Sequence, residues 1–161
     1  MDVRMRDPIV HRVDDLLERI EHATVATVSA DGMPWNTPVF FARRGLSLYW
    51  SSRRDAQHSL NIEHNGRGFI VVFDSGREDA SGAGVYIEAA VHQLTDEIAI
   101  CDAAQLIYSR RRVPVPSARH FAPGSVHAVY HARALKVWSN VLHTSGEIPW
   151  DERVEFHVDG R

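Results

Sequence analysis

One short segment of the chain gathers side chains that could bind an anionic group. It reads Ser51-Ser52-Arg53-Arg54-Asp55-Ala56-Gln57-His58 and stands between a predicted strand and a helix that begins near Asp55. Hydroxyl, guanidinium and imidazole groups donate hydrogen bonds to phosphate oxygens, and the first amides of a helix add their dipole. A solvated polar loop before a helix is the alternative interpretation, and the segment by itself leaves both open.

Other chemical patterns are weak. No GxSxG, Walker, dinucleotide GxGxxG, HExxH or CxxC motif occurs among the 161 residues. Of the 10 histidines, His127 and His131 lie on one predicted strand, where roughly 13 Å would separate their alpha carbons, too far to share an ion easily. His120, in a loop, is a further histidine that could approach a ligand. We predict no metal site, and the sequence identifies no catalytic residue.

The elements that must position the polar segment are short helices and strands. Asp7-Pro8 is a good helix start, and the helix is expected to end at His22. Asp31-Gly32 predicts a hairpin turn, and Asn65-Gly66 predicts a helix end. The predicted strands span 24–29, 35–42, 46–51, 69–73, 85–94, 126–138 and, weakly, 153–158, and the later helices span 55–65 and about 95–112.

Several burial predictions accompany these elements. The run 69–73 is apolar throughout and predicts a strand buried on both faces. Pro38 predicts an edge strand or a bulge. The lone Cys101 is interpreted as a small buried apolar residue. The remaining residues expected to face inward are Ala56, Leu60 and Ile62 on the first of the later helices, and Ile98, Leu106 and Ile107 beside Cys101 on the second.

Consecutive hairpins predict antiparallel pairing, and about six strands of this kind usually close into a barrel. We predict one domain over 1–161, with an N-terminal helix in 1–22, a barrel in 23–140 and a C-terminal tail in 141–161. The formal net charge of -3 argues against nucleic-acid binding. No long apolar run and no signal-peptide core occur, so we expect no membrane association and a cytoplasmic location.

Three segments carry a resemblance to a known family. They are 26–41, which contains Asp31-Gly32-Met33-Pro34 and Pro38-Val39-Phe40-Phe41, then 48–62, and finally Lys136-Val137-Trp138. Together they resemble the pyridoxamine 5′-phosphate oxidase-like superfamily of split barrels. The resemblance implies a mainly β protein with peripheral helices, a six- to seven-stranded antiparallel split β-barrel, and a homodimer that holds FMN at its interface.

The resemblance also implies roles for particular residues. At the positions that hold the flavin phosphate stand Ser51, Ser52, Gln57 and His58. Val39 and Phe40 belong to the strand that lines the ring, and Trp138 matches an aromatic residue that reaches across the dimer. Asn36 stands where the oxidase has an arginine, and its amide can still donate to the ring edge. Phe41 stands where the oxidase has a lysine. Relative to the oxidase, the residues at positions 36 and 41 therefore each remove a positive charge.

The implied function is an FMN-dependent oxidoreductase in which electrons pass through flavin N5 to or from a small molecule. The Arg-x-His signature of pyridoxamine phosphate oxidation is missing after Trp138, where Ser139-Asn140-Val141 follows. The substrate therefore stays open. Relatives that bind a deazaflavin or haem, and a flavin-binding module without turnover, are the alternatives.

Overall fold

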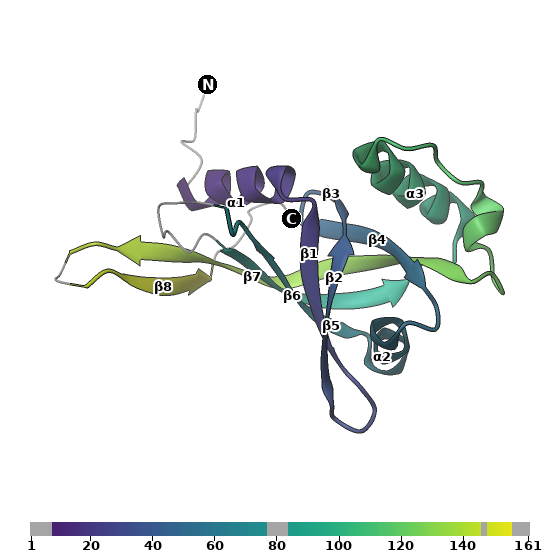
Figure 1. The fold of residues 1–161 in the computed structure, drawn as a ribbon, viewed down its shortest axis with the longest axis horizontal. Coiled ribbons are helices and arrows are strands. Elements are labelled where there is room, and N and C mark those ends of the chain that lie inside the picture. The colour runs from purple at the N-terminus through teal and green to yellow at the C-terminus, as the bar shows by residue number, and fades with distance from the viewer. Residues whose placement is uncertain (1–7, 77–83, 146–147, 156–161) are drawn as a thin grey trace.

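The computed structural model describes residues 8–76, 84–145 and 148–155. Its helices are α1 (Pro8–Arg19), α2 (Gln57–Asn65), α3 (Glu97–Arg111) and a short 3-10 turn at Ala118–Phe121. Its strands are β1 (His22–Val28), β2 (Pro34–Phe40), β3 (Ala42–Arg44), β4 (Ser47–Arg53), β5 (Arg67–Phe73), β6 (Gly84–Gln93), β7 (His127–His143) and β8 (Trp150–Glu155). Figure 1 shows the strands wrapped around each other, with α1 and α3 on their outside.

The strands form one antiparallel sheet in the hydrogen-bonded order β2-β1-β5-β6-β7-β4-β3, and β8 pairs with β7. This mostly antiparallel architecture confirms the predicted split-barrel fold class. The described residues contain eight strands, one more than expected, because Phe41 interrupts the predicted strand 35–42 and separates β2 from β3. β2 lies at the end of the order, which confirms the edge position predicted from Pro38.

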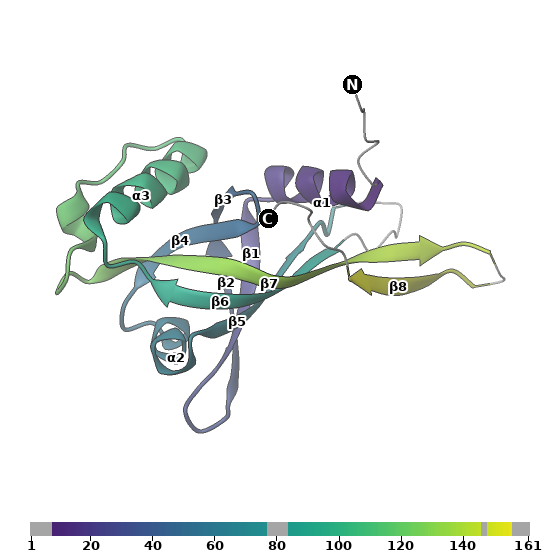
Figure 2. The ribbon, with the colours of Figure 1, turned by 180° about the vertical axis from the view of Figure 1, so that it is seen from behind.

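The protein has two apolar clusters. The larger one fills the barrel, where Leu17, Phe41, Trp50 and Ile70 are fully buried. The smaller one lies between α3 and the outer side of β3, β4 and β7, and Ile107 is at its centre. Figure 2 shows α3 beside β4 at one end of the molecule and β8 at the opposite end, with α1 between them. The larger cluster therefore fills the inside of the barrel, and α3 covers the outer side of β3, β4 and β7.

Several predicted boundaries shift. α1 ends at Arg19 rather than His22, because His22 already pairs with Phe40 as the first residue of β1. β7 continues past the predicted end of its strand to His143. The C-terminal segment predicted as a tail contains β8, which starts at Trp150 instead of Arg153. Residues 156–158 of that predicted strand, and Asp7 at the helix start, lie outside the described residues.

Some burial predictions were wrong. Cys101 is exposed and Ile98 is 74% exposed, because the buried positions of α3 follow the i, i+3, i+4, i+7 stripe of Ile100, Ala103, Ala104 and Ile107. On α2, Leu60 is 46% exposed. Both segments form helices as predicted, but the sheet against which each helix packs determines which of its faces is buried.

The strand β5 is also buried on one face only. Ile70 and Val72 are fully buried, but Phe73 on the opposite face is 51% exposed and Phe69 is half-buried. Strand side chains alternate between faces, and here only one face meets the barrel core. The opposite face, which α3 does not cover, presents apolar side chains to the outside.

Candidate functional site

The polar segment joins the end of β4 to the start of α2. Ser51 and Ser52 are half-buried on β4 and pair with Val129 and Ala128 of β7. In the described part of the chain neither hydroxyl has a hydrogen-bond partner, so both can donate to a ligand. Their backbone is fixed by the β4–β7 ladder, which gives the hydroxyls a rigid support.

The N-terminus of α2 is left without a side-chain cap. Ala56 occupies the cap position and makes no side-chain hydrogen bond, whereas in α3 the carboxylate of Asp96 accepts from the amide of Ala99 at 2.8 Å. The first amides of a helix have no intrahelical acceptor and carry the positive end of the dipole. At α2 these donors are separated from the two serines by residues 53–56, and a helix N-terminus of this kind can accept an anion.

The two arginines of the segment are engaged elsewhere. Arg53 makes a bidentate pair with Asp55, with Nε–Oδ1 and Nη2–Oδ2 distances of 2.8 and 2.7 Å. The hydrogen bond from Arg53 lowers the pKa of the Asp55 carboxyl, which stays ionised. Arg54 is half-buried and donates to the carbonyl oxygens of Ser125 at 2.8 Å and of Phe121 at 3.2 Å. Positive charge at this segment is therefore partly neutralised.

Gln57 and His58 lie on the first turn of α2 in different surroundings. Gln57 is exposed and donates its Nε2 to Oδ1 of Asn61 at 2.8 Å, and Asn61 in turn donates to Oγ1 of Thr27 on β1 at 2.9 Å. His58 is only 4% exposed, and its Nε2 has no partner in the described structure. Burial lowers the pKa of the His58 imidazole, so the ring is neutral near pH 7.

The hydrogen bond from Asn61 also places the β1–β2 hairpin beside α2. Thr27 pairs with Trp35, and its neighbour Ala26 pairs with Asn36. Asn36 is exposed, so its amide is free to meet a ligand from this hairpin. The structure thus brings the hairpin carrying Asn36 to the helix that carries Gln57 and His58.

The two other β2 residues point in opposite directions. Val39 is 7% exposed and packs in the barrel core. Phe40 is half-buried on the outer face, where the guanidinium of Arg111 lies 4.7 Å from its ring centroid and His22 meets its edge. Phe41, at the position of the oxidase lysine, is fully buried. Of these three, Phe40 alone faces away from the core.

The structure adds two histidines next to the segment. His127 is the β7 partner of Arg53, and its ring stacks on that of His120 with centroids 4.7 Å apart. His120 also meets the edge of the buried Phe121. The sequence pointed to each histidine separately but not to their position beside Arg53. That position results from the pairing of β4 with β7, which lie more than 70 residues apart in the chain, so no local sequence pattern could predict it.

Trp138 lies far from this segment along the same strand. Ser51 pairs with Val129, and Trp138 follows nine residues further along β7, where it pairs with Tyr86. At the usual strand rise this corresponds to roughly 30 Å of extended chain. Within one protomer, Trp138 therefore does not share a site with Ser51.

Trp138 instead belongs to the uncovered outer face of the sheet. Its half-buried ring lies 6.1 Å from that of Phe69. Beside Phe69 is a cleft of about 290 Å³, with Ala26 and Pro34 in its wall and the Arg67–Glu88 ion pair of 3.2 Å at its border. This apolar face is open in the single chain.

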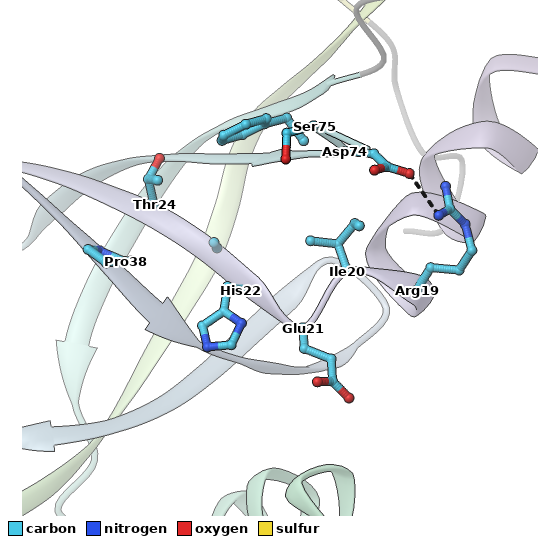
Figure 3. A pocket seen from close by; sticks show the side chains of 10 residues that line it. Arg19, Ile20, Glu21, His22, Thr24, Pro38, Asp74 and Ser75 are labelled. Carbon is cyan, nitrogen blue, oxygen red and sulfur yellow. Dashed lines mark hydrogen bonds and ion pairs between the residues drawn. The ribbon is translucent and has the colours of Figure 1, made fainter. Parts of the chain in front are cut away.

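Two larger clefts contain none of the predicted site residues. Figure 3 shows one of about 480 Å³, where His22 and Pro38 line the wall and the Arg19–Asp74 ion pair of 2.9 Å closes one side. The other, of about 500 Å³, runs along the far side of α2 past Ser59 and Tyr130. Among the described residues, no group of three or more His, Cys, Asp or Glu side chains could hold a metal ion.

Comparison with known proteins identifies the class to which this fold and segment belong. The sequence pattern of the pyridoxamine 5′-phosphate oxidase family matches residues 9–130, and the chain belongs to that family. No curated protein matches the chain. The match confirms the family resemblance found in the sequence, and it ends before the second half of β7.

Solved structures of the same fold differ in what they bind. A haem-binding protein from Mycobacterium smegmatis has a TM-score of 0.66 and 18% identity over 92% of this chain, which spans only 59% of that protein's length. The haem storage protein HutZ from Vibrio cholerae has a TM-score of 0.67 and 13% identity, covering 80% of this chain and 92% of that one. An F420 reductase has a TM-score of 0.59 and 20% identity, covering 77% and 94%. At these identities the likeness establishes the fold alone.

No helix in the described residues is both long and apolar enough to cross a membrane.

Proposed function

We propose that the protein is an FMN-dependent oxidoreductase that works as a homodimer and acts on a small molecule. One observation carries the proposal: the N-terminus of α2 has no side-chain cap, and residues 53–56 connect it to two serines of β4 whose hydroxyls have no partner in the described structure. The chain belongs to the pyridoxamine 5′-phosphate oxidase family, and the resemblance to that family, which implies that this segment holds the flavin phosphate, supports the assignment. The cytoplasmic location stays a prediction.

The donors fit a phosphate, although the charge at the segment is modest. Ser51 and Ser52 would supply hydroxyls, and the first amides of α2 would supply N–H groups and the helix dipole. Gln57 donates one hydrogen bond from Nε2 to Asn61, and the second hydrogen of this amide group can still be donated to a ligand. Because Arg53 and Arg54 are engaged, we expect weaker phosphate binding than a free arginine would give.

Bound FMN would supply the two-electron chemistry of its ring, and the chain would supply position and electrostatics. The ring would extend from the α2 segment toward the β1–β2 hairpin. There Asn36 can donate its amide to the N1–C2 edge, where negative charge develops on reduction. Phe40, on the outer face of β2, can cover the ring and exclude water. No described side chain is needed as an acid or base.

The dimer is the second part of the proposal. Trp138 is separated from Ser51 by roughly 30 Å of β7, and it lies with Phe69 on an uncovered apolar face. A second copy that packs against this face would bury it and would bring Trp138 to the partner's cofactor segment. Exposed apolar faces of this kind mark interaction sites.

Haem and deazaflavin binding are the competing functions. The haem proteins from M. smegmatis and V. cholerae and the F420 reductase share the fold. A deazaflavin would use the same phosphate donors, whereas haem requires an axial ligand. Besides the buried His58 of the segment itself, the stacked pair His120 and His127 is a candidate, because His127 pairs with Arg53. A flavin-binding module without turnover would show the same site and no reduction of the bound flavin.

The test is a titration of the purified protein with FMN, followed by flavin fluorescence and by the visible spectrum after desalting. We expect retained flavin, and a Kd raised at least about 100-fold in the double variant Ser51→Ala/Ser52→Ala, since each of the two lost charge-assisted hydrogen bonds is worth about 1.5–3 kcal/mol. Ser47→Ala, on the same strand, is the matched control and should bind normally.

A protein that retains no FMN but gives a Soret band with haem would overturn the proposal in favour of haem binding. Binding of F420 without FMN would favour the deazaflavin alternative. If FMN is retained but neither nicotinamide nor dye donors reduce it, the result would agree with the FMN site and contradict the oxidoreductase activity.

A further inference from the structure

A second, smaller cleft lies outside the candidate cofactor site. It has a volume of about 190 Å³ and opens between α3 and the outer face of the sheet. Arg44 at the end of β3, Tyr49 on β4 and His131 on β7 form its sheet wall. Asp102 and Leu106 of α3 form the opposite wall. None of these residues belongs to the α2 segment or to the Trp138 face.

Two opposite charges face this cleft from its two walls. Arg44 and Asp102 are both exposed, and in the described part of the chain neither makes a hydrogen bond or an ion pair. Arg43, the neighbour of Arg44 in the chain, is by contrast paired with Asp14 at 3.1 Å. A guanidinium and a carboxylate across a cleft can bind a ligand that carries both an anionic and a cationic group.

Beside the two charges, the lining of the cleft is aromatic and apolar. The rings of Tyr49 and His131 stack in parallel with centroids 4.7 Å apart, and His92 meets the edge of His131 at 5.1 Å. Burial lowers the pKa of the His131 imidazole, and His92 and Arg133 lower it further, so the ring is neutral near pH 7. Arg44 and Asp102 therefore supply the fixed charges, while Leu94 and Leu106 add apolar surface.

We propose that this cleft binds a free amino acid with an aliphatic side chain. Its carboxylate would pair with Arg44 and its ammonium group with Asp102, and its side chain would cover Tyr49 and Leu106. The volume suits a molecule of the size of leucine and is too small for the larger ligands that fill ordinary cofactor pockets. The site is independent of the FMN proposal, because it shares no residue with that segment.

The test is an isothermal titration, with 15N-edited NMR to locate the binding, using L-leucine, isoamylamine and 4-methylpentanoate. The two analogues each lack one of the charged groups. We expect L-leucine to bind with a Kd of roughly 1 mM and each analogue at least about tenfold more weakly. Amide shifts should concentrate on β4 and on the turn of α3 around Asp102.

Arg44→Gln and Asp102→Asn should each weaken leucine binding about tenfold or more while the melting temperature stays unchanged, because both side chains are exposed. Arg119→Gln and Asp151→Asn, two exposed positions away from the cleft, are matched controls and should bind like the parent protein. Undetectable leucine binding, equal binding of the analogues, or binding unaffected by Arg44→Gln and Asp102→Asn would each overturn the proposal.

Discussion

The guanidinium of Arg110, near the end of α3, lies over the ring of Phe41 at 4.7 Å from its centroid. Its Nη2 also donates to the carbonyl oxygens of Leu17 at 3.0 Å, Glu18 at 2.7 Å and Ile20 at 2.9 Å. These carbonyls end α1, where the helix dipole favours a cation. Arg110 thus joins α1, α3 and the barrel core through one side chain.

Replacing Arg110 by methionine should lower the free energy of unfolding by about 2–3 kcal/mol, because three carbonyl oxygens lose their charged donor and the cation–π contact is lost. Urea denaturation measures the effect. Arg111→Met is the matched control: Arg111 stacks on Phe40 and Tyr108 but is exposed, so its loss should be smaller. Equal losses in the two variants would contradict the prediction.

Arg54 should hold the 121–125 turn against β4. Arg54→Gln removes donors to Phe121, Ala122 and Ser125, so we expect a loss of about 2 kcal/mol and faster hydrogen exchange in this turn. The neighbouring Arg53→Gln breaks only an exposed ion pair with Asp55 and should leave stability unchanged. Unchanged exchange in Arg54→Gln would show that the turn is held by other contacts.

The buried hydrogen bond from Asn61 to Thr27 should fix α2 on β1. Thr27→Val leaves the Asn61 amide without its acceptor in a buried site, and we expect a loss of about 1–3 kcal/mol. The half-buried Thr24→Val on the same strand is the control. In a double-mutant cycle with Asn61→Leu, a coupling energy near zero would mean that the hydrogen bond does not contribute.

Stability should fall as the pH decreases below about 6.5. Burial lowers the pKa of His58 and of His131 in the folded protein, while in the unfolded chain each titrates near 6.5. Between the lowered pKa of the folded protein and the pKa of about 6.5 in the unfolded chain, the unfolded state binds more protons than the folded state, so acid favours unfolding. Above about pH 6.5 the full stability is present. Melting temperatures across this range measure the effect.

His58→Gln should flatten that pH dependence because it removes one of the two described histidines whose pKa is lowered by burial. The control is His64→Gln, an exposed residue on the same helix, which should keep the parent profile. An unchanged profile in His58→Gln would contradict the assignment of acid sensitivity to this residue.

The outer face of the sheet should be the dimer interface. Trp138→Arg places a charge beside Phe69 and should convert the protein to a monomer in light scattering, since an unpaired charge buried in an apolar interface is strongly unfavourable. Ile98→Arg, on the 74% exposed position of α3, is the control and should leave the assembly intact. A parent protein that is monomeric at all concentrations would exclude the shared cofactor site.

The sequence by itself determined the local elements and the family. Asp31-Gly32 and Asn65-Gly66 predicted a turn and a helix end that the structure confirms, because left-handed backbone such as that of Gly66 at φ 67° strongly favours glycine. The order of strands and helices indicated an antiparallel split barrel. These features depend on interactions between residues close in the chain.

The tertiary structure alone decided which faces are buried and which distant residues meet. Cys101 and Ile98 fit a helix but lie on its outer side, and Phe73 fits a strand but faces outward, because the direction of packing is set by neighbours far along the chain. Likewise, the β4–β7 register brings His127 to Arg53 and separates Trp138 from Ser51. The local sequence pattern predicts whether a segment forms a helix or a strand. The register between strands and the face that is buried depend on pairing between residues far apart in the chain, which no short segment determines.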